Sequence, residues 1–413
     1  LLLTLFGQGL IASFALLGGF LLAAARTLPL LIRPVTGGAD RRARGPVAAW
    51  FWADTRQQLP GLSLALMALL LAVAANIGVS TMVSSFRLTF VAFLDQRLAA
   101  ELYLRIDDAA DAQALVPVMA THADEVLPLL RVDATAAGLP AQILGVRVGP
   151  TYRENWVFLA ASPAAWDRVA AGDAIVTNEQ FARRAGLWVG DSVTLAETAY
   201  PIAAVIGDYG NPRGQLIVGE ALFRALYPDV TAQSFGLRTT DPAALRATLG
   251  DAGVPDSAMT DQAALKSFSL QIFERTFAVT AALNVLPLAV AGFAMLMSLL
   301  TLADQRLPQL APVWALGLTR RQLGRLELMR AGLFALLGSA VAVPVGLGLA
   351  WVLLAKVNVD AFGWRLPMFL FPGAYAILAG AAIAAAVLAA LWPSLRLMRT
   401  PPARLLQVFA HER

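Results

Sequence analysis

Residue types that perform catalysis are scarce in this chain of 413 residues, which contains no Cys and only two His. His122 lies in an Ala-rich stretch typical of a helix, and His411 lies near the end of the sequence. Neither a His-based catalytic triad nor a metal site with several His ligands can be built from them. The acidic residues show no spacing that singles out a catalytic pair. We therefore assign no catalytic residue and no metal ligand, and we expect the chain not to be an enzyme.

Phosphate binding would need a different pattern, which the sequence lacks. A phosphate-binding loop places glycines just before a lysine, and the only lysines, Lys266 and Lys356, have no such glycines before them. We therefore expect no cofactor in this chain. By this pattern the chain cannot itself hold the phosphates of ATP.

Residues suited to binding another protein are concentrated in one basic segment, Leu307 to Arg330, which reads LPQLAPVWALGLTRRQLGRLELMR. Proline lacks an amide donor and is tolerated in the first turn of a helix, and glycine readily ends a helix. We therefore expect a short helix that begins near Pro308 or Pro312 and ends at Gly317.

A second helix is expected to follow at once. Thr319 and Gln322 have the spacing of a capping box, and the helix should continue through Glu327 into the next apolar run. This arrangement would lay the short helix along the cytoplasmic membrane surface and expose Trp314 beside Arg320. The alternative is an interfacial loop, with Trp at the level of the lipid head groups and Arg on the cytoplasmic side.

A membrane is needed to position these segments. The chain is 58% hydrophobic and 15% charged, and its mean hydropathy of +0.64 is well above that of an ordinary globular domain. A helix of about 20 apolar residues spans roughly 30 Å of hydrocarbon. The five charge-free runs that exceed this length are Leu1 to Ala25, Gln57 to Phe86, Thr276 to Ala303, Ala331 to Ala355 and Leu366 to Leu395.

Charge sets the expected orientation. Basic residues outnumber acidic ones in Arg26 to Leu59, Asp304 to Arg330 and Arg396 to Arg413, whereas acidic residues prevail in Arg87 to Arg275. Positively charged loops are retained in the cytoplasm, so the three basic segments are expected inside and the long segment outside.

Nucleic acid is not an expected partner, because the basic excess lies in the inner loops. Leu1 to Ala25 has basic residues after it, unlike a secretory signal, and is expected to belong to a longer membrane chain.

The long external segment has the mixed periodicity of a folded α+β domain. LYLRID and AQILGVRV alternate as half-buried strands do. Asp241 and Pro242 mark a helix start, and Asn178 is expected to cap a helix that ends before Gly186. Further expected strands are Ala174 to Thr177, Ser192 to Leu195 and Tyr200 to Ile206. The predicted fold class is an α-helical membrane protein with about five transmembrane helices plus an extracytoplasmic α+β domain.

The chain is divided on this basis into ten segments. They are a transmembrane helix at 1–33, a cytoplasmic basic loop and interfacial helix at 34–59, a transmembrane helix and stalk at 60–98, the extracytoplasmic α+β domain at 99–263, a stalk and transmembrane helix at 264–303, the basic cytoplasmic segment at 304–330, a transmembrane helix at 331–355, an external loop at 356–365, a transmembrane helix at 366–395 and a cytoplasmic tail at 396–413.

Three further features are expected within these segments. The stretch PVAAWFWADTRQQLP should form an amphipathic helix in the membrane interface, with Trp50, Phe51 and Trp52 as anchors. The helix that leads from the external domain into the third span begins without Gly or Pro and should be a stiff stalk. Asn76 and Asn284 either bond to each other between spans two and three or are satisfied within their own helices.

A family resemblance adds to this interpretation. WALGLTRRQL, followed by Glu327, resembles the LRALGATRRQ…E signature of the FtsX-like permeases, the membrane subunits of MacB-type and lipoprotein-releasing ABC transporters. The external stretch AIVTNEQFARRAGLWVGDSVTLAETAYPIAAVIGD resembles their periplasmic core domain, and RTPPARLL resembles their C-terminal tail. One span, an external domain and three spans form the unit of that family. Leu1 to Ala25 would then be the last span of a preceding unit in a long two-unit permease.

The resemblance implies a contact site for an ATPase. In that family the signature forms the cytoplasmic coupling segment that the ATPase grips. The residues carried over are Gln305, Gln309, Trp314, Ala315, Leu316, Gly317, Thr319, Arg320, Arg321, Gln322 and Glu327. Gln309-Leu310 and Trp314 depart from the acidic and basic residues usual at these positions, so the contact is expected to be mostly apolar.

The implied function is that of an ABC transporter permease subunit in a bacterial cytoplasmic (inner) membrane. It would transmit ATP-driven motion to the external domain for the export or extraction of a lipoprotein, a lipid or another compound. The implied partners are a cytoplasmic ABC ATPase, a second permease copy or paralogue, the lipid bilayer and a lipoprotein or periplasmic protein. Two alternatives remain, a membrane sensor with a ligand-binding external domain and a secondary transporter, and the uncharged spans disfavour the latter.

Overall fold

The computed structural model describes residues 9–209, 211, 213–315 and 317–399. The chain forms two compact units. The helical unit comprises Leu1–Ser85, Phe277–Val357 and Pro367–Arg413, and the α+β unit comprises Phe86–Thr276 and Asn358–Leu366. The chain therefore passes from one unit to the other several times.

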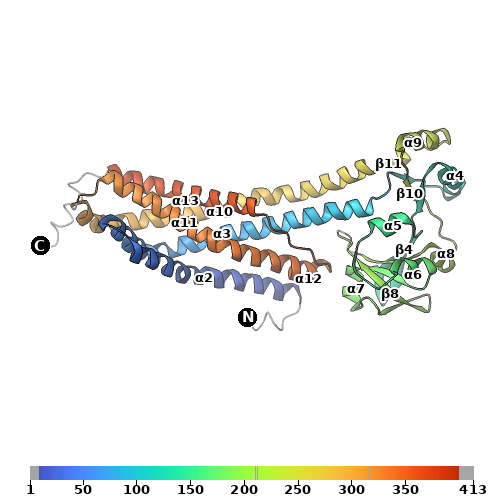
Figure 1. Ribbon diagram of the computed structural model, residues 1–413, viewed down its shortest axis with the longest axis horizontal. Helices are drawn as coiled ribbons and strands as arrows, with labels where there is room; N and C mark the ends of the chain where they lie inside the picture. Colours follow the sequence, from blue (N-terminus) through green and yellow to red (C-terminus); the bar gives the residue numbers. More distant parts are fainter. Residues whose placement is uncertain (1–8, 210, 212, 316, 400–413) are drawn as a thin grey trace. The chain divides into compact units, whose positions relative to one another are not determined.

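Long helices make up the helical unit (Figure 1). They are α2 (Leu10–Arg42), the first part of α3 (Pro46–Arg97), the last part of α10 (Gln262–Ala315), α11 (Arg320–Val352) with the π-helical turn η2 (Leu353–Val357), and α13 (Pro372–Arg399). By length and composition, four stretches of the described residues can cross a membrane: Leu10–Arg42, Pro46–Arg97, Arg320–Phe362 and Pro372–Arg396. A shorter apolar stretch, Val285–Thr301, lies within α10. Among the described residues of the predicted apolar runs, those of the first run from Leu10 onward and those of the three middle runs fall in helices, and the last run is helical from Pro372 onward.

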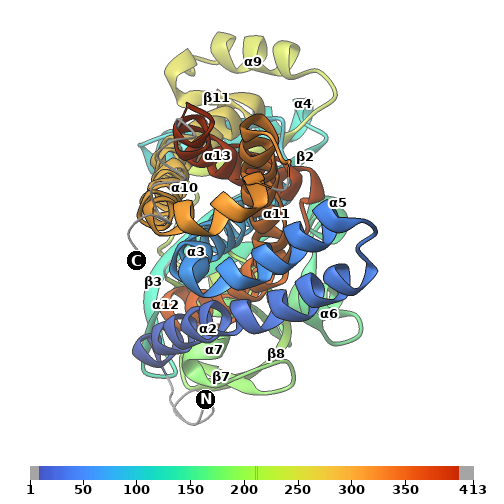
Figure 2. The ribbon, with the colours of Figure 1, turned by 90° about the vertical axis from the view of Figure 1, so that its left-hand side faces the viewer.

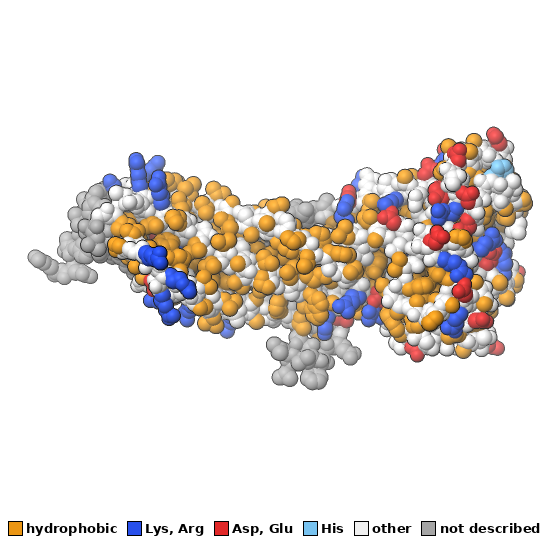
Figure 3. Space-filling view, in the orientation of Figure 1, with side chains coloured by type: hydrophobic (Ala, Val, Ile, Leu, Met, Phe, Trp, Pro, Cys, Tyr) orange, Lys and Arg blue, Asp and Glu red, His pale blue; other side chains and the backbone are white. Residues whose placement is uncertain are grey.

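The surface of the helical unit is apolar, as a bilayer requires. Figure 3 shows hydrophobic side chains over the visible face of these helices, with Lys and Arg gathered at one end. Exposed large side chains on α2, α11 and α13 include Ile11, Leu336, Ile377 and Leu388. Exposed apolar side chains of this density are costly in water and favourable in lipid.

Close approach of α3 and α11 forms the centre of the bundle (Figure 2). A Cβ atom on Gly346 would lie 2.6 Å from the Cβ of Ile77, and one on Gly78 would lie 2.4 Å from a methyl group of Leu349. Only glycine fits at such positions, because any side chain would displace its neighbour. Over about one turn, the backbone of each helix at its glycine is therefore in contact with a side chain of the other helix.

The predicted interfacial helix is wrong in one respect. Residues 46–59 are the first turns of the continuous helix α3, which passes through Pro60 without ending. Phe51, expected to anchor the chain in lipid, is only 8% exposed and packs inside the protein. The region expected as a loop at residues 34–42 also belongs to helix α2. A proline removes only one helical hydrogen bond, and packing of the surrounding turns compensates for it.

The predicted short helix at Pro308 or Pro312 is also wrong. The backbone of α10 continues through both prolines and ends at Ala315. The long preceding helix has already been nucleated, so each proline costs a bond and some bending rather than a new helix start. The predicted end at glycine is confirmed, because Gly317 lies just beyond α10 with φ of 105°.

Two sheets build the α+β unit. The smaller sheet is antiparallel with strand order β11-β1-β10-β2, and the larger has the order β3-β4-β9-β6-β8-β5 with β7 paired to β8. The strands of the smaller sheet are β1 (Leu102–Arg105), β2 (Glu125–Pro128), β10 (Ser234–Arg238) and β11 (Met259–Asp261). Those of the larger are β3 (Leu130–Ala136), β4 (Leu139–Val146), β5 (Phe158–Ala161), β6 (Ile175–Asn178), β7 (Ser192–Leu195), β8 (Thr198–Ile206) and β9 (Gly214–Gly219).

Short helices connect these strands. They are α4 (Ala109–His122), α5 (Pro150–Asn155), α6 (Ala165–Ala171), α7 (Glu179–Ala185), α8 (Glu220–Leu226), α9 (Pro242–Asp251) and α12 (Asn358–Phe362), with the 3₁₀ turn η1 (Asp256–Ala258). The predicted caps are confirmed, since the Asn178 side chain accepts a hydrogen bond from the Phe181 amide at 3.1 Å and Asp241 accepts one from the Ala244 amide at 3.0 Å. Gly186 ends α7 in the left-handed conformation, as expected.

The α+β unit also contains a pair of stalk helices, the last part of α3 and the first part of α10. Phe273 of α10 packs against Phe86 and Phe90 of α3, with ring centroids 5.3 Å apart in both pairs. An ion pair of 2.9 Å joins Arg87 to Glu274. The predicted stalk is confirmed as a continuous helix.

Candidate coupling site

The turn between α10 and α11, residues 315–322, is shaped by local hydrogen bonds. The Gln322 amide donates to Thr319 Oγ1 at 3.3 Å, and the Thr319 amide donates to Gln322 Oε1 at 2.8 Å. These two bonds form the predicted capping box and fix Arg320 as the first residue of α11. Gly317 supplies the positive φ that the chain needs to reverse at this point.

The structure describes the predicted contact residues unevenly. Arg320 is half-buried, whereas Arg321, Gln322 and Gly317 are exposed. Leu316 lies outside the described residues, as do the side chains of Gln305, Gln309, Trp314 and Ala315, whose backbones belong to α10. Their part in binding an ATPase stays a prediction.

Glu327 points inward from α11. Its carboxylate accepts a hydrogen bond of 2.9 Å from the Arg330 guanidinium, and the Glu327 side chain is 13% exposed. Glu327 was expected to belong to the contact surface. That role stays a prediction; in the structure Glu327 is the partner of a buried arginine and lies about three helical turns after Gly317.

Arg330 is the largest fully buried side chain in the described part of the protein, at 1% exposure. Its Nε donates to Thr55 Oγ1 at 3.0 Å, and its NH2 group lies 2.6 Å from the Asp54 carboxylate. The guanidinium carbon lies 5.3 Å from the centre of the Phe51 ring. Each of its three nitrogens therefore faces a polar partner on α3 or α11.

A second layer of contacts holds these partners. Thr55 Oγ1 donates to the Phe51 carbonyl at 2.6 Å, and Gln58 Nε2 donates to the Asp54 carboxylate at 2.8 Å. We call Asp54, Thr55, Gln58, Glu327 and Arg330 the Arg330 cluster. Its charges are one guanidinium and two carboxylates, so the cluster carries an excess negative charge when all three groups are ionised.

The cost of separating this cluster is large. Removing one partner of a buried ion pair typically costs about 3–5 kcal/mol, because the remaining charge stays buried without its counter-charge. The Arg330 and Asp54 side chains are 2% and 10% exposed, so solvent screens them little. The cluster therefore ties the start of α11 firmly to the start of α3.

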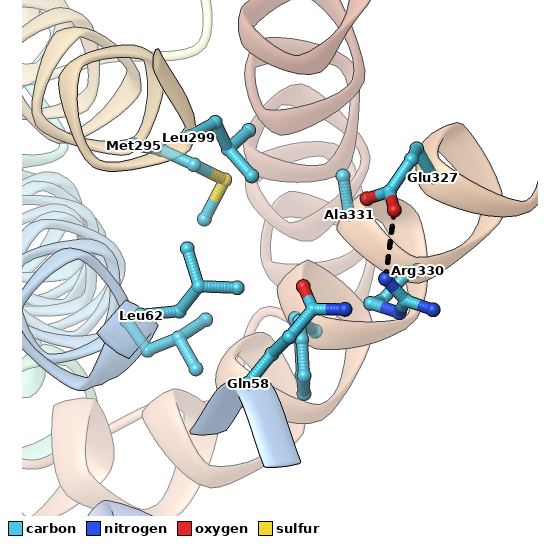
Figure 4. A pocket seen from close by; sticks show the side chains of 9 residues that line it. Gln58, Leu62, Met295, Leu299, Glu327, Arg330 and Ala331 are labelled. Carbon is cyan, nitrogen blue, oxygen red and sulfur yellow. Dashed lines mark hydrogen bonds and ion pairs between the residues drawn. The ribbon is translucent and has the colours of Figure 1, made fainter. Parts of the chain in front are cut away.

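A third helix completes the site (Figure 4). A small cavity of about 10 Å³ is lined by Gln58 and Leu62 from α3, Glu327 and Arg330 from α11, and Met295 and Leu299 from α10, together with Leu66, Ala331 and Phe334. The volume holds at most about one water molecule. The three helices that carry the turn, the stalks and the cluster thus meet at one point.

Both stalks lead into neighbouring strands of the smaller sheet. α3 is followed by β1 and α10 is preceded by β11, and β1 pairs antiparallel with β11 in the register Leu102 to Asp261. The Gln262 amide donates to the Glu101 carbonyl at 3.1 Å across this junction. If the two stalks moved relative to each other, the hydrogen bonds between β1 and β11 would therefore be strained.

α11 also leads to the α+β unit, through η2 and α12. The Asn358 side chain donates to the Trp364 carbonyl at 2.6 Å and closes the loop that follows α12. The Arg365 amide donates to the Glu179 carboxylate at 3.2 Å, at the start of α7. Glu179 is 2% exposed and also pairs with Arg183. The loop after α12 is therefore bound to a buried residue that is itself held in place.

Sequence reasoning missed the Arg330 cluster. Asp54, Thr55 and Gln58 lie at helical spacing on one face of α3, in a segment interpreted as interfacial, and this spacing was the available signal. The two alternatives for Asn76 and Asn284, a bond between them or bonds within their own helices, both stay open. Asn76 is 2% exposed, and the Asn284 side chain lies outside the described residues.

Comparisons with known proteins bear on this site. Residues 281–402 match the family model of the FtsX-like permease C-terminal domain. An uncharacterized ABC transporter permease protein of Mycobacterium tuberculosis is 28% identical over 97% of this chain, and the chain spans 50% of that relative. The match includes both sides of the turn and Arg330.

Two solved structures are similar to part of the chain. The extracellular domain of the noncanonic ABC-type transporter YknZ from Gram-positive bacteria is 12% identical, with a TM-score of 0.29, over 39% of this chain and 98% of its own. The periplasmic region of MacB from Actinobacillus actinomycetemcomitans is 12% identical, with a TM-score of 0.31, over 41% of this chain and 91% of its own.

The family predicted from the signature is confirmed by the family-model match. The matched region contains the capping box of α11 and two members of the Arg330 cluster, Glu327 and Arg330, whereas Asp54, Thr55 and Gln58 lie outside it on α3. Residues 281–402 therefore form an FtsX-like permease C-terminal domain.

Proposed function

We propose that this chain is a permease subunit of an ABC transporter in a bacterial cytoplasmic membrane and that it transmits the motion of a partner ATPase to an external domain. The single observation that supports this most is the Arg330 cluster, which ties α11 to α3 behind the α10–α11 turn. A force applied at the turn would act on three helices together.

The route of the motion has three steps in this proposal. The ATPase holds the turn around Gly317 from the cytoplasm. The Arg330 cluster passes the displacement of α11 to α3, and the continuous helices α3 and α10 pass it to strands β1 and β11. The loop at Arg365 supplies a further contact, with α7.

The partners follow from the same proposal. The chain would bind a cytoplasmic ABC ATPase, which would bind the ATP, and a second permease copy or paralogue would complete the assembly. The cargo would be a lipoprotein, a lipid or another exported compound at the external face. The C-terminus and the α10–α11 turn would be cytoplasmic, and the α+β unit would be external.

The test is formation and turnover of the complex. The full-length chain would be purified together with an ABC ATPase that copurifies with it from its native membrane, and ATP hydrolysis would be measured for the natural sequence, Gly317→Pro and Trp314→Asp. We expect both variants to lose most of the bound ATPase or of its stimulated turnover. Unchanged complex and unchanged turnover in both would contradict the assignment of the turn.

The same preparation separates the alternatives. A sensor would bind a ligand through its external domain without any stimulated ATP hydrolysis. A secondary carrier would transport in proteoliposomes that contain no ATPase and would respond to an ion gradient.

A further inference from the structure

The α+β unit contains a large cavity between its two sheets. Its volume is about 560 Å³, within the range of about 300–1,000 Å³ that is usual for ligand sites. Strands β1, β2, β10 and β11 of the smaller sheet and β3, β4 and β9 of the larger sheet contribute to its wall. The cavity is partly open to solvent, so a ligand could enter it from outside.

The wall of the cavity is mainly apolar. Leu127, Leu144, Val146 and Phe235 line it from three strands. These side chains are at most 8% exposed and belong to the packed interior of the unit. A hydrocarbon chain placed against them would lose water contact at a gain of about 0.8 kcal/mol for each buried methylene group.

The charged groups of the lining are all basic. Among the described residues that line the cavity, Arg97, Arg105 and Arg131 carry charge and none is acidic. Arg97 is fixed by Asp208 at 3.3 Å and by the Trp156 ring at 4.0 Å, so its charge is compensated. The exposed Arg105 and Arg131 lie on β1 and β3 and leave a positive charge at the margin of an apolar space.

Whether Arg105 and Arg131 can attract an anion depends on the carboxylates near them. Arg105 lies 3.5 Å from Asp107, and both side chains are strongly exposed, so water screens the pair. Asp133, the neighbouring carboxylate on β3, pairs with Arg213 at 3.5 Å. Arg131 is thus the arginine best placed to meet an anion.

Two tyrosines in the lining remain neutral donors. Burial raises the pKa of Tyr103 to about 12, and burial also raises the pKa of Tyr152. A neutral phenol can donate a hydrogen bond to an oxygen anion and does not repel it. The two phenols therefore add hydrogen-bond donors to the lining without adding negative charge.

We propose that this cavity binds an amphiphile with one acyl chain and an anionic head group, with the chain between the sheets and the head group at Arg131 and Arg105. The binding stands on the cavity alone. That the ligand is part of the transported cargo rests on the proposed function.

The cavity also touches both stalks. Leu265 of α10 lines it, as do Arg97 at the end of α3 and Ala99 and Ala100 just beyond. A ligand in the cavity would contact the ends of the two helices that lead to the membrane. Occupancy would in this way depend on the separation of the stalks.

The test is photolabelling of the full-length chain in phosphatidylcholine nanodiscs without an ATPase. A palmitate analogue with a diazirine near the end of its chain would be added, and the labelled peptides would be identified by mass spectrometry. We expect label on β4 and β10, reduced by excess palmitate but not by hexadecanol or by inorganic phosphate. Label confined to the membrane helices, or equal competition by hexadecanol, would overturn the proposal.

Variants make the test specific. The double variant Arg105→Gln/Arg131→Gln should raise the palmitate concentration needed for competition at least tenfold, because both guanidinium groups proposed to meet the carboxylate are removed. Gln142→Trp, which fills the cavity from β4, should abolish the label.

The control is Arg153→Gln, because Arg153 is an exposed arginine of the same unit outside the lining. It should change neither the palmitate concentration needed for competition nor the label. Competition unchanged in the double variant would also overturn the proposal. The assay needs no ATP hydrolysis, so failure of binding and failure of the transport function are observed separately.

Discussion

The guanidinium of Arg330 lies 2.6 Å from the carboxylate of Asp54, and both side chains are buried in the helical unit. This contact joins the start of α11 to the start of α3, just behind the turn that the FtsX-like signature marks. A buried ion pair adds little net stability compared with apolar packing of the same volume. Its directional contacts are better suited to fixing how two helices move together, and the predictions below separate this role from stability.

The first prediction concerns the cluster itself. Arg330→Met should lower the free energy of unfolding by about 3–5 kcal/mol, because the Asp54 and Glu327 carboxylates would stay buried without a counter-charge. Arg325→Met, an exposed arginine on the same helix, should leave stability unchanged. The measurement is thermal unfolding of the purified chain in detergent.

The triple variant Asp54→Leu/Glu327→Leu/Arg330→Met removes all three charges together. It should recover most of the lost stability, because no unpaired charge remains. It should not recover stimulated ATP hydrolysis if the cluster transmits motion. Recovery of both properties would show that the cluster is only structural.

The second prediction concerns the turn. Gly317→Val should weaken the α10–α11 turn by about 1–2 kcal/mol, because the φ of 105° is strained for a β-branched residue. Gly317→Asn should cost less, since Asn tolerates positive φ. Hydrogen exchange of the first turn of α11 measures the difference, and equal exchange in the two variants would contradict the expected strain.

The third prediction compares two contacts in the stalk. Arg87→Ala/Glu274→Ala removes an exposed ion pair and should change hydrogen exchange of the stalk little, since such pairs contribute about 0–1 kcal/mol. Phe273→Ala removes a ring that is 7% exposed and should cost about 3 kcal/mol locally. Exchange should rise in residues 86–97 only in the second variant. The opposite order would mean that charge, not aromatic packing, holds the stalks together.

Local signals in the sequence predicted much of this fold. Thr319 with Gln322 and Asn178 with Gly186 determine helix ends through side chains a few residues apart, so one sequence was sufficient. The Arg330 contact to Asp54 depends on how two distant helices pack, which no local pattern specifies. The helix through Pro308 and Pro312 was missed for a related reason, since both prolines lie near the end of a 54-residue helix whose length no local preference indicates.

The fourth prediction is a pH dependence in the α+β unit. The pKa of Tyr103 is raised to about 12 from its ordinary value of 10.0, mainly by burial. The folded state then holds its proton more tightly than the unfolded state. The stabilisation is complete below about pH 10 and is lost as the pH rises toward about 12. Tyr103→Phe should make the loss of stability over this range shallower, as followed by unfolding at a series of pH values. An identical slope would show that the phenol of Tyr103 is not shielded.

The most direct test of the central claim uses a single labelled cysteine, because these 413 residues contain none and any cysteine elsewhere in the full-length protein can be replaced. A single Ser267→Cys substitution on the exposed side of the α10 stalk would carry an environment-sensitive fluorophore, with the full-length chain reconstituted beside its ATPase. We predict that a non-hydrolysable ATP analogue changes the fluorescence in the chain with the natural Arg330 cluster. The change should disappear in the triple variant that lacks the charges of Asp54, Glu327 and Arg330, although the ATPase remains bound. An equal change in both chains, or no change in either with the ATPase bound, would contradict transmission through this cluster.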